Sequence, residues 1–445
     1  MAFAWLTTVA GAQKGVNAGP ADPRIVSALG QVSAARLQAD VEKLVSFGTR
    51  STLSAQDQAE ISAGHGIGAA REWIKSEFES YSRECGGCLE VKIDSFTEAV
   101  GERVPQPTKI TNVYAILRGT DPQGAKRIVL VTGHYDSRNG HNLDSVGAAP
   151  GANDDASGTA VSLECARVLS RLKFPATIVF LAVAGEEQGL YGSAHFAQMA
   201  KSEGWDLEAV LNNDIVGGDR NPQQDTKVVR VFSEGVPVAA TDAELRRIRN
   251  LGGESDSPSR QLARYVAEVG PTYDVGLQPM LIFRLDRYLR GGDHYSFNQQ
   301  GLAAVRFSEF HEDYDHQHQD VRTENGVEYG DLPKFVNFDY MASVARLNAA
   351  TLASLASAPA PPGKVRLLTK ELQNDSTLTW EASPAAAGYE VLWRATTSPE
   401  WEHLQAAGNV TRITVPLSKD NAIFAVRSVD KGGHRSMAVV PIPEP

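Results

Sequence analysis

Acidic and imidazole side chains gather directly after three short apolar segments of the chain. The segments span residues 128–131, 178–183 and 210–215. The side chains that follow or close them are His134, Asp136, Glu186, Glu187 and Asp214. In an open, largely parallel sheet, ligands bind outside the carboxyl ends of the strands, so we expect these groups to converge there.

Two further polar clusters complete a candidate metal site. Asp154 lies in the segment 151–158, and His316 and His318 lie in the segment 313–320. Two zinc ions that share one bridging carboxylate, each with an open position for water, would need two private ligands apiece. The side chains that fit this requirement are His134, Asp154, Glu187, Asp214 and one of the late histidines.

Local spacing predicts supporting roles at this site. His134 and Asp136 are two residues apart at a strand end and share a face, so Asp136 can accept a hydrogen bond from the imidazole and fix its tautomer. Glu186 and Glu187 are adjacent on a turn and must point apart. One of them can bind metal while the other acts as general base toward water.

The elements that would position these residues indicate an α/β fold. Short apolar segments between turn residues suit strands that helices cover on both faces. Helical patterns run over residues 23–78, 158–172 and 332–355, and further strands are predicted at residues 89–93, 112–117, 228–232, 280–283 and 303–307. We expect a mixed, largely parallel central sheet flanked by helices, followed by a small all-β sandwich.

Composition shifts predict the domain organisation. Residues 1–23 are expected to be a flexible N-terminus or the remnant of a signal, residues 24–357 the α/β domain, and residues 358–363 a Pro/Ala linker. Residues 364–445 contain short alternating strands between turn signals, the pattern of a β-sandwich.

Charge and hydropathy exclude some classes of protein. The 445 residues include 43 Lys+Arg and 54 Asp+Glu, for a net charge of −11. A nucleic-acid binder would need a basic stripe, so we expect no nucleic-acid partner. No stretch approaches the roughly 18 apolar residues of a membrane-spanning helix, so we expect no membrane span.

The N-terminus and the cysteines bear on the compartment. Residues 1–13 are small and apolar and include Ala-Gly-Ala, as a secretory signal remnant would. Cys85 and Cys88 could close a tight structural turn as a disulfide under oxidising conditions. We therefore expect a periplasmic or secreted protein.

Four motifs together resemble peptidase family M28, the zinc exopeptidases that include bacterial leucyl aminopeptidases and transferrin-receptor-like carboxypeptidases. They are Thr-Gly-His-Tyr-Asp-Ser at 132–137, Pro-Gly-Ala-Asn-Asp-Asp-Ala-Ser-Gly at 150–158, Gly-Glu-Glu-Gln-Gly-Leu-Tyr-Gly-Ser at 185–193 and Gly-Gly-Asp-His-Tyr-Ser-Phe at 291–297. The resemblance covers residues 24–357. It implies that His134 and Asp214 complete one zinc shell, that Asp154 bridges, that Glu187 and a late histidine hold the second zinc, and that Glu186 is the base.

The resemblance also supplies further candidates. Similar bacterial members place the final histidine in a Gln-His-Gln-Asp run, which favours His318 over His316 as the fifth ligand, with Asp320 as its outer support. Asp293 and His294 match the family's Asp-His motif near the active site. Tyr288 is the candidate for a tyrosine that assists the oxyanion and binds substrate.

The C-terminal strands resemble a fibronectin type III module, through Trp380, the run 388–393 and the run 429–433. Such a module could bind a surface, a polysaccharide or another protein.

The function expected from these features is that of a di-zinc exopeptidase acting on peptide substrates, most simply an aminopeptidase that uses a metal-bridged water with Glu186 as general base. Two alternatives on the same fold are a carboxypeptidase and a glutaminyl-cyclase-like enzyme. An alternative of another class is a matrix- or polysaccharide-binding protein with a vestigial peptidase site.

Overall fold

The computed structural model describes residues 13–14, 16–370 and 372–444, and it divides into two compact units. One unit is Pro20–Ser357; the other joins the segment up to Gly19 to the chain from Ala358 onward. Residues 1–12 of the expected N-terminal tail lie outside the described residues. Of its remainder, β1 (Gln13–Lys14) pairs with β15 (His403–Gly408), and α1 begins at Pro23.

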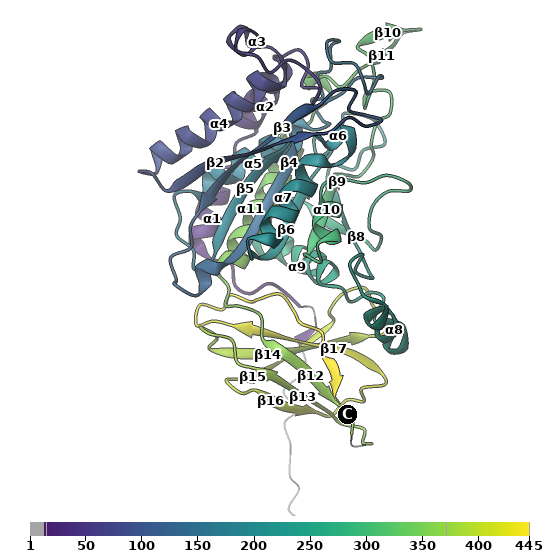
Figure 1. Cartoon of the computed structure of the whole chain (residues 1–445). Helices are drawn as coiled ribbons and strands as arrows, with labels where there is room; N and C mark the ends of the chain where they lie inside the picture. The colour runs from purple at the N-terminus through teal and green to yellow at the C-terminus, as the bar shows by residue number, and fades with distance from the viewer. Residues whose placement is uncertain (1–12, 15, 371, 445) are drawn as a thin grey trace, which may run out of the picture. The chain divides into compact units, whose positions relative to one another are not determined.

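The larger unit is built on one eight-stranded sheet (Figure 1). In spatial order its strands are β2 (Leu89–Glu98), β3 (Thr108–Leu117), β5 (Thr177–Val183), β4 (Arg127–His134), β6 (Asp206–Asn213), β9 (Ala304–Glu309), β7 (Val228–Ser233) and β8 (Gln278–Ile282). The four central strands β5, β4, β6 and β9 are parallel to one another. Antiparallel pairs join β2 to β3, β3 to β5 and β9 to β7, and β8 is parallel to β7. The predicted mixed sheet with a parallel centre is confirmed.

Helices cover both faces of this sheet (Figure 1). One face carries α2 (Ala34–Val45), α4 (Gly66–Glu84), α5 (Ala156–Leu169), α9 (Pro258–Tyr273) and α11 (Phe338–Ser357), and the other carries α7 (Tyr191–Ser202) and α10 (His294–Gln299). The remaining helices are α1 (Pro23–Leu29), α3 (Gln58–Ala63), α6 (Glu186–Gly189) and α8 (Asp242–Leu251). Cys85 and Cys88 form a disulfide in the turn from α4 to β2.

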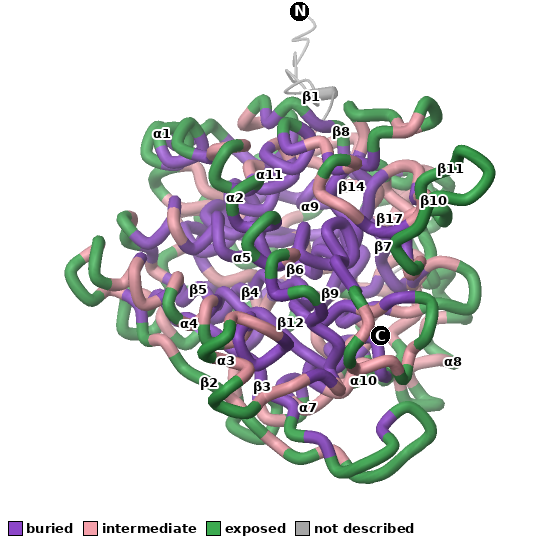
Figure 2. The backbone as a smooth tube through the Cα atoms, turned by 90° about the horizontal axis from the view of Figure 1, so that it is seen from above, coloured by how far each residue is buried: buried purple, intermediate pink, exposed green. Residues whose placement is uncertain are grey.

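Burial explains why the central strands are mainly apolar rather than alternating. Every residue of β4 and β5 is buried, as Figure 2 shows for the middle of the sheet. Strands covered by helices on both faces cannot present a polar side to water, so Val, Ile and Leu fill both faces. This rigid core fixes the strand ends that carry the polar side chains.

Two regions of the larger unit differ from the sequence prediction. The last helix begins at Phe338, not at residue 332, because Asn337 caps it: the Tyr340 N–H donates to Asn337 Oδ1 at 3.2 Å. A short 3-10 turn, Pro333–Phe335, occupies part of the predicted first turn. Residues 218–300, where no helix was predicted, contain α8, α9 and α10.

The smaller unit consists of two four-stranded sheets. One has the order β1, β15, β14 (Gly388–Ala395), β17 (Ala422–Val429); the other has the order β16 (Arg412–Val415), β13 (Ser376–Glu381), β12 (Gly363–Leu368), β18 (Ile442–Glu444). Trp380 and Tyr389, one from each sheet, pack in a common apolar cluster. The two sheets therefore form a sandwich with its own core.

Two short strands, β10 (Arg322–Glu324) and β11 (Val327–Tyr329), pair as an exposed hairpin. Across the described residues, no helix is long and apolar enough to cross a membrane.

Candidate metal centre

The ends of the four central parallel strands and the loops after them carry the predicted site residues. His134 is the last residue of β4, Asp214 directly follows β6, and Glu186 and Glu187 open α6 after β5. Asp154 precedes α5, and His318 lies in the loop beyond β9. The topology therefore brings together five segments that are far apart in the sequence, as the rule for parallel strand ends predicts.

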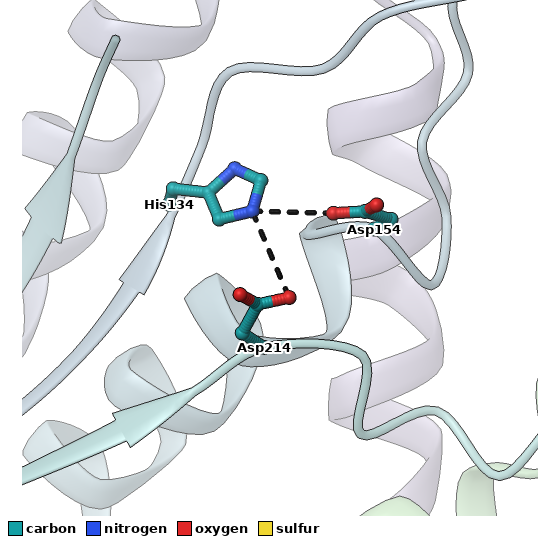
Figure 3. A group of neighbouring side chains, drawn as sticks. All are labelled: His134, Asp154 and Asp214. Atoms are coloured by element: carbon teal, nitrogen blue, oxygen red, sulfur yellow. Dashed lines mark ion pairs between the residues drawn. The ribbon is translucent and has the colours of Figure 1, made fainter. Parts of the chain in front are cut away.

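His134, Asp154 and Asp214 form the first ligand group (Figure 3). His134 Nε2 lies 3.2 Å from Asp154 Oδ1 and 4.0 Å from Asp214 Oδ1. All three side chains are buried, with 1%, 6% and 3% exposure. Their ligand atoms converge on one point inside the protein.

Asp154, Glu187 and His318 form the second ligand group. His318 Nε2 lies 2.8 Å from Asp154 Oδ2 and 3.1 Å from Glu187 Oε1. Asp154 thus turns one carboxylate oxygen to each group. This is the geometry of a carboxylate shared by two neighbouring cation sites.

The donors of both groups suit zinc. Imidazole nitrogen and carboxylate oxygen are common zinc ligands, and each group supplies three of them. His134 Nε2 is buried and makes no well-aligned hydrogen bond, its contact being the 3.2 Å ion pair with Asp154 Oδ1, and a buried polar atom left in this way is costly. A cation would satisfy it, so the residues present fit the metal.

Asp136 stands behind His134. Its Oδ1 is 3.5 Å from His134 Nδ1, and that ring nitrogen also lies 3.1 Å from the Asp136 carbonyl oxygen. The Thr52 hydroxyl and the Glu187 N–H donate to Asp136 Oδ2 at 2.7 and 3.2 Å. Asp136 therefore contacts the imidazole and the start of α6 at once, which orients both.

The two adjacent glutamates face different ways. Glu187 points to His318, whereas Glu186 Oε2 lies 4.0 Å from His134 Nε2 at the other ligand group. Burial raises the pKa of the Glu186 carboxyl well above its ordinary value; His134 opposes this shift, and the charges of Asp214, Glu187 and Asp293 add to it. A carboxyl held in this way is suited to accept and return protons.

The Asp-His pair at the start of α10 lies close to the first ligand group. Asp293 is fully buried, and burial raises its pKa to about 7 despite the opposing charge of His134. His294 Nε2 lies 2.9 Å from the Leu285 carbonyl oxygen. Asp293 is thus within electrostatic reach of His134, while His294 fixes the loop that precedes it.

The structure does not bring Tyr288 into the metal centre. Its side chain is 78% exposed, and its hydroxyl accepts a hydrogen bond from Arg284 at 2.7 Å. His316 also lies outside both ligand groups: its Nδ1 is 2.6 Å from Asp219 Oδ2, and its ring stacks on Phe335. Of the two late histidines, His318 is the one placed among the ligands.

Two arginines at the site were not predicted. Arg306, in β9, is fully buried and places Nη2 2.9 Å from Asp214 Oδ1 and Nη1 3.0 Å from Asp286 Oδ1. Arg138 donates from Nε to Glu187 Oε2 at 2.9 Å, and its Nη2 lies 2.6 Å from His318 Nδ1. The expected outer support for His318, Asp320, instead accepts a hydrogen bond from the Gly140 N–H.

The sequence held one signal for Arg306: it is the single charged residue within the predicted apolar strand 303–307. A charge on a strand buried on both faces must be paired. Its partner could have been sought among the carboxylates at the neighbouring strand ends.

A family model and named relatives match this chain. The model of peptidase family M28 matches residues 112–329. A protein of Leptosphaeria maculans named probable zinc metalloprotease is 47% identical over 93% of this chain and 95% of its own length. A protein of Pyricularia oryzae with the same name is 48% identical over 95% of this chain and 85% of its own.

Solved structures share the fold. The Legionella pneumophila LapA aminopeptidase has a TM-score of 0.54 at 22% identity, covering 78% of each chain. An aminopeptidase from Aneurinibacillus sp. strain AM-1 has a TM-score of 0.51 at 15% identity, over 76% of this chain and 96% of that one. A glutaminyl cyclase from Macrostomum lignano has a TM-score of 0.52 at 15% identity, over 77% and 95%.

The convergent carboxylates and imidazoles fit a zinc-dependent enzyme of the α/β class. The chain belongs to peptidase family M28, and it is a zinc metallopeptidase.

Proposed function

We propose that this metallopeptidase is a di-zinc exopeptidase, and that it is an aminopeptidase removing N-terminal residues from peptides. The observation that carries the proposal is the pair of ligand groups that share Asp154, one oxygen facing each. His134 and Asp214 would hold one zinc, and Glu187 and His318 the other. Each ion would retain an open position, as catalytic zinc sites do.

The residues of the chain have distinct tasks in this proposal. When bound, the zinc ions supply Lewis-acid polarisation of the scissile carbonyl and of water. Glu186 Oε2 takes the proton of the attacking water and returns it to the leaving amine, which its raised pKa permits. Asp136 keeps the His134 ring in place, and Arg306 offsets the negative charge of Asp214.

A carboxypeptidase or a glutaminyl-cyclase-like enzyme is the alternative on the same fold, and a cyclase is among the structural neighbours. The cyclase branch of the family is expected to work with one zinc. Because both ligand groups are complete here, we favour hydrolysis with two.

The test compares three forms of one peptide: free at both ends, acetylated at the N-terminus, and amidated at the C-terminus. An aminopeptidase cleaves the free and amidated forms and leaves the acetylated form intact. Cleavage of the acetylated form but not the amidated one would establish a carboxypeptidase. Conversion of an N-terminal glutamine peptide to its pyroglutamyl form, with loss of ammonia and no peptide bond broken, would establish a cyclase.

We also propose that the protein is secreted and that the smaller unit is a fibronectin type III-like module that binds a surface, a polysaccharide or another protein. The disulfide between Cys85 and Cys88 supports an oxidising compartment. The two-sheet sandwich with a separate core supports an independent binding module. Pull-down of the isolated module on insoluble polysaccharides tests the second point, and a module that binds none of them and no protein from the secreted fraction would refute it.

A further inference from the structure

A small cavity lined by acidic side chains lies beside the metal centre. Its lining includes Asp154, which belongs to both ligand groups described above. The lining also includes four residues outside those groups: Asp219, Glu309, Asp313 and His316. Asp219, Asp313 and His316 each offer one ligand atom, and these atoms all lie within 4.8 Å of one another. They form a third group of potential metal ligands.

Two carboxylate oxygens in this cavity lack hydrogen bonds among the described residues. Asp219 Oδ1 and Glu309 Oε1 are both buried without a partner, on side chains that are 2% and 0% exposed. A buried polar atom left unsatisfied costs about 1–3 kcal/mol, and more when it is charged. Such atoms indicate a missing ligand.

The other oxygens of these two carboxylates are fixed. Glu309 Oε2 accepts from Asn153 Nδ2 at 3.0 Å and from the Asp219 N–H at 2.9 Å. Asp219 Oδ2 is 2.6 Å from His316 Nδ1. Each side chain is therefore held through one oxygen, while its second oxygen has no hydrogen-bond partner among the described residues.

An ion pair between His316 and Asp219, with the imidazole stacked on Phe335, is the simpler explanation. It accounts for Asp219 Oδ2 but leaves Asp219 Oδ1 and Glu309 Oε1 without partners. One protonated imidazole also offsets only one of the negative charges around the cavity.

The cavity is close to solvent. Asp313 and Glu312 line it and also line an open surface depression that includes His311 and Asp315. The Asp313 side chain is 23% exposed. A hydrated cation can therefore reach the third group past Asp313 without crossing the metal centre.

We propose that Asp219, Asp313 and His316 bind a further divalent cation, separate from the metals of the two ligand groups, with Glu309 beside them in the lining of the cavity. One imidazole with carboxylates suits Zn²⁺ or Mn²⁺. Asp219 lies in the loop that follows β6, and this loop begins with Asp214. His316 lies in the loop after β9, which also carries His318. The cation joins these two loops and holds them in place.

The test is equilibrium dialysis of the full chain against Zn²⁺ and, separately, Mn²⁺, followed by metal analysis. The variants are Asp313→Asn and His316→Gln, and the control is Asp315→Asn, an exposed carboxylate on the same turn. Circular dichroism confirms that each variant is folded. We expect each of the two variants to bind one equivalent fewer than wild type and the control to match wild type.

The test compares the number of ions bound by wild type with the number bound by each variant. The result can therefore be judged even if the metal centre holds fewer ions than we propose. Equal binding by wild type and both variants would overturn it. Loss of an equivalent from His316→Gln alone would assign His316 to the metal centre and overturn it as well. Loss of more than one equivalent from Asp313→Asn would show that the site is not separate.

Discussion

Replacement of Arg306 by methionine tests the electrostatics of the metal centre. The guanidinium is fully buried between Asp214 and Asp286, at 2.9 and 3.0 Å. Methionine retains much of the side chain's length but leaves both carboxylates without this partner. Breaking a buried pair in this way costs about 3–5 kcal/mol.

This loss of stability can be expressed as a decrease in melting temperature. The unit Pro20–Ser357 has roughly 340 residues, and unfolding entropy is about 2.1 cal/mol/K per residue, so zinc-free Arg306→Met should melt ~4–7 °C below wild type. With zinc present the loss should be smaller, because a cation next to Asp214 replaces the missing positive charge.

The assay is calorimetry of both proteins with chelator and with zinc. The matched control is Arg322→Met, which breaks an exposed Arg–Glu pair of 3.3 Å and should cost less than about 1 kcal/mol. A zinc-free Arg306→Met that melts with wild type, or a loss that zinc does not reduce, would refute the reasoning.

Three further outcomes are expected. Glu186→Gln should keep its metals in metal analysis but lose turnover by about 10²–10⁴-fold, since the amide cannot accept a proton; retained turnover would remove Glu186 as the base. A fragment of residues 20–357 should fold and hydrolyse small substrates, because the apolar clusters of the two units share no residue; a folded fragment that cannot bind zinc would contradict this. Burial raises the pKa of Asp40 to about 7, above its unfolded value of 3.8, so its stabilising contribution is lost as pH rises through 7. The free energy of unfolding of Asp40→Asn in urea, taken relative to that of wild type, should therefore rise by about 3 kcal/mol between pH 5 and pH 9. A difference between the two proteins that does not change with pH would contradict this expectation.

The central sheet could be predicted because burial on both faces leaves a simple pattern. Apolar segments such as 178–183 coincide with β5, and the polar residues after them lie at the strand ends, where parallel topology brings them together. The sequence singled out His134, Glu187 and Asp214 for this reason, and the structure places them in groups of potential metal ligands.

Elements of the 218–300 region were missed although one carried a clear signal. α9 begins at Pro258 after Ser257, whose side chain accepts from the Arg260 N–H. A Ser-Pro start followed by apolar residues at helical spacing is typical of a capped helix. β8 was predicted at residues 280–283 and spans Gln278–Ile282, although its burial pattern follows neither clean alternation nor full burial.

Side-chain partners across the sheet were the least predictable part. The sequence around Arg306 does not predict that its partners are Asp214 and Asp286. The sequence around Arg138 likewise does not predict its contact with His318. Such contacts depend on which strand ends become neighbours and on which rotamers fit. Choosing between His316 and His318 likewise required the path of the loop after β9, since residues two apart could share a side.

Anomalous diffraction at the zinc absorption edge, from crystals of the zinc-loaded protein, tests the central claim most directly. The proposed function predicts two peaks on either side of Asp154, one among His134, Asp154 and Asp214 and the other among Asp154, Glu187 and His318. A peak among Asp219, Asp313 and His316 would belong to the third group and is counted apart from these two. A single peak at saturating zinc, or a second peak ligated by His316 in place of His318, would contradict it.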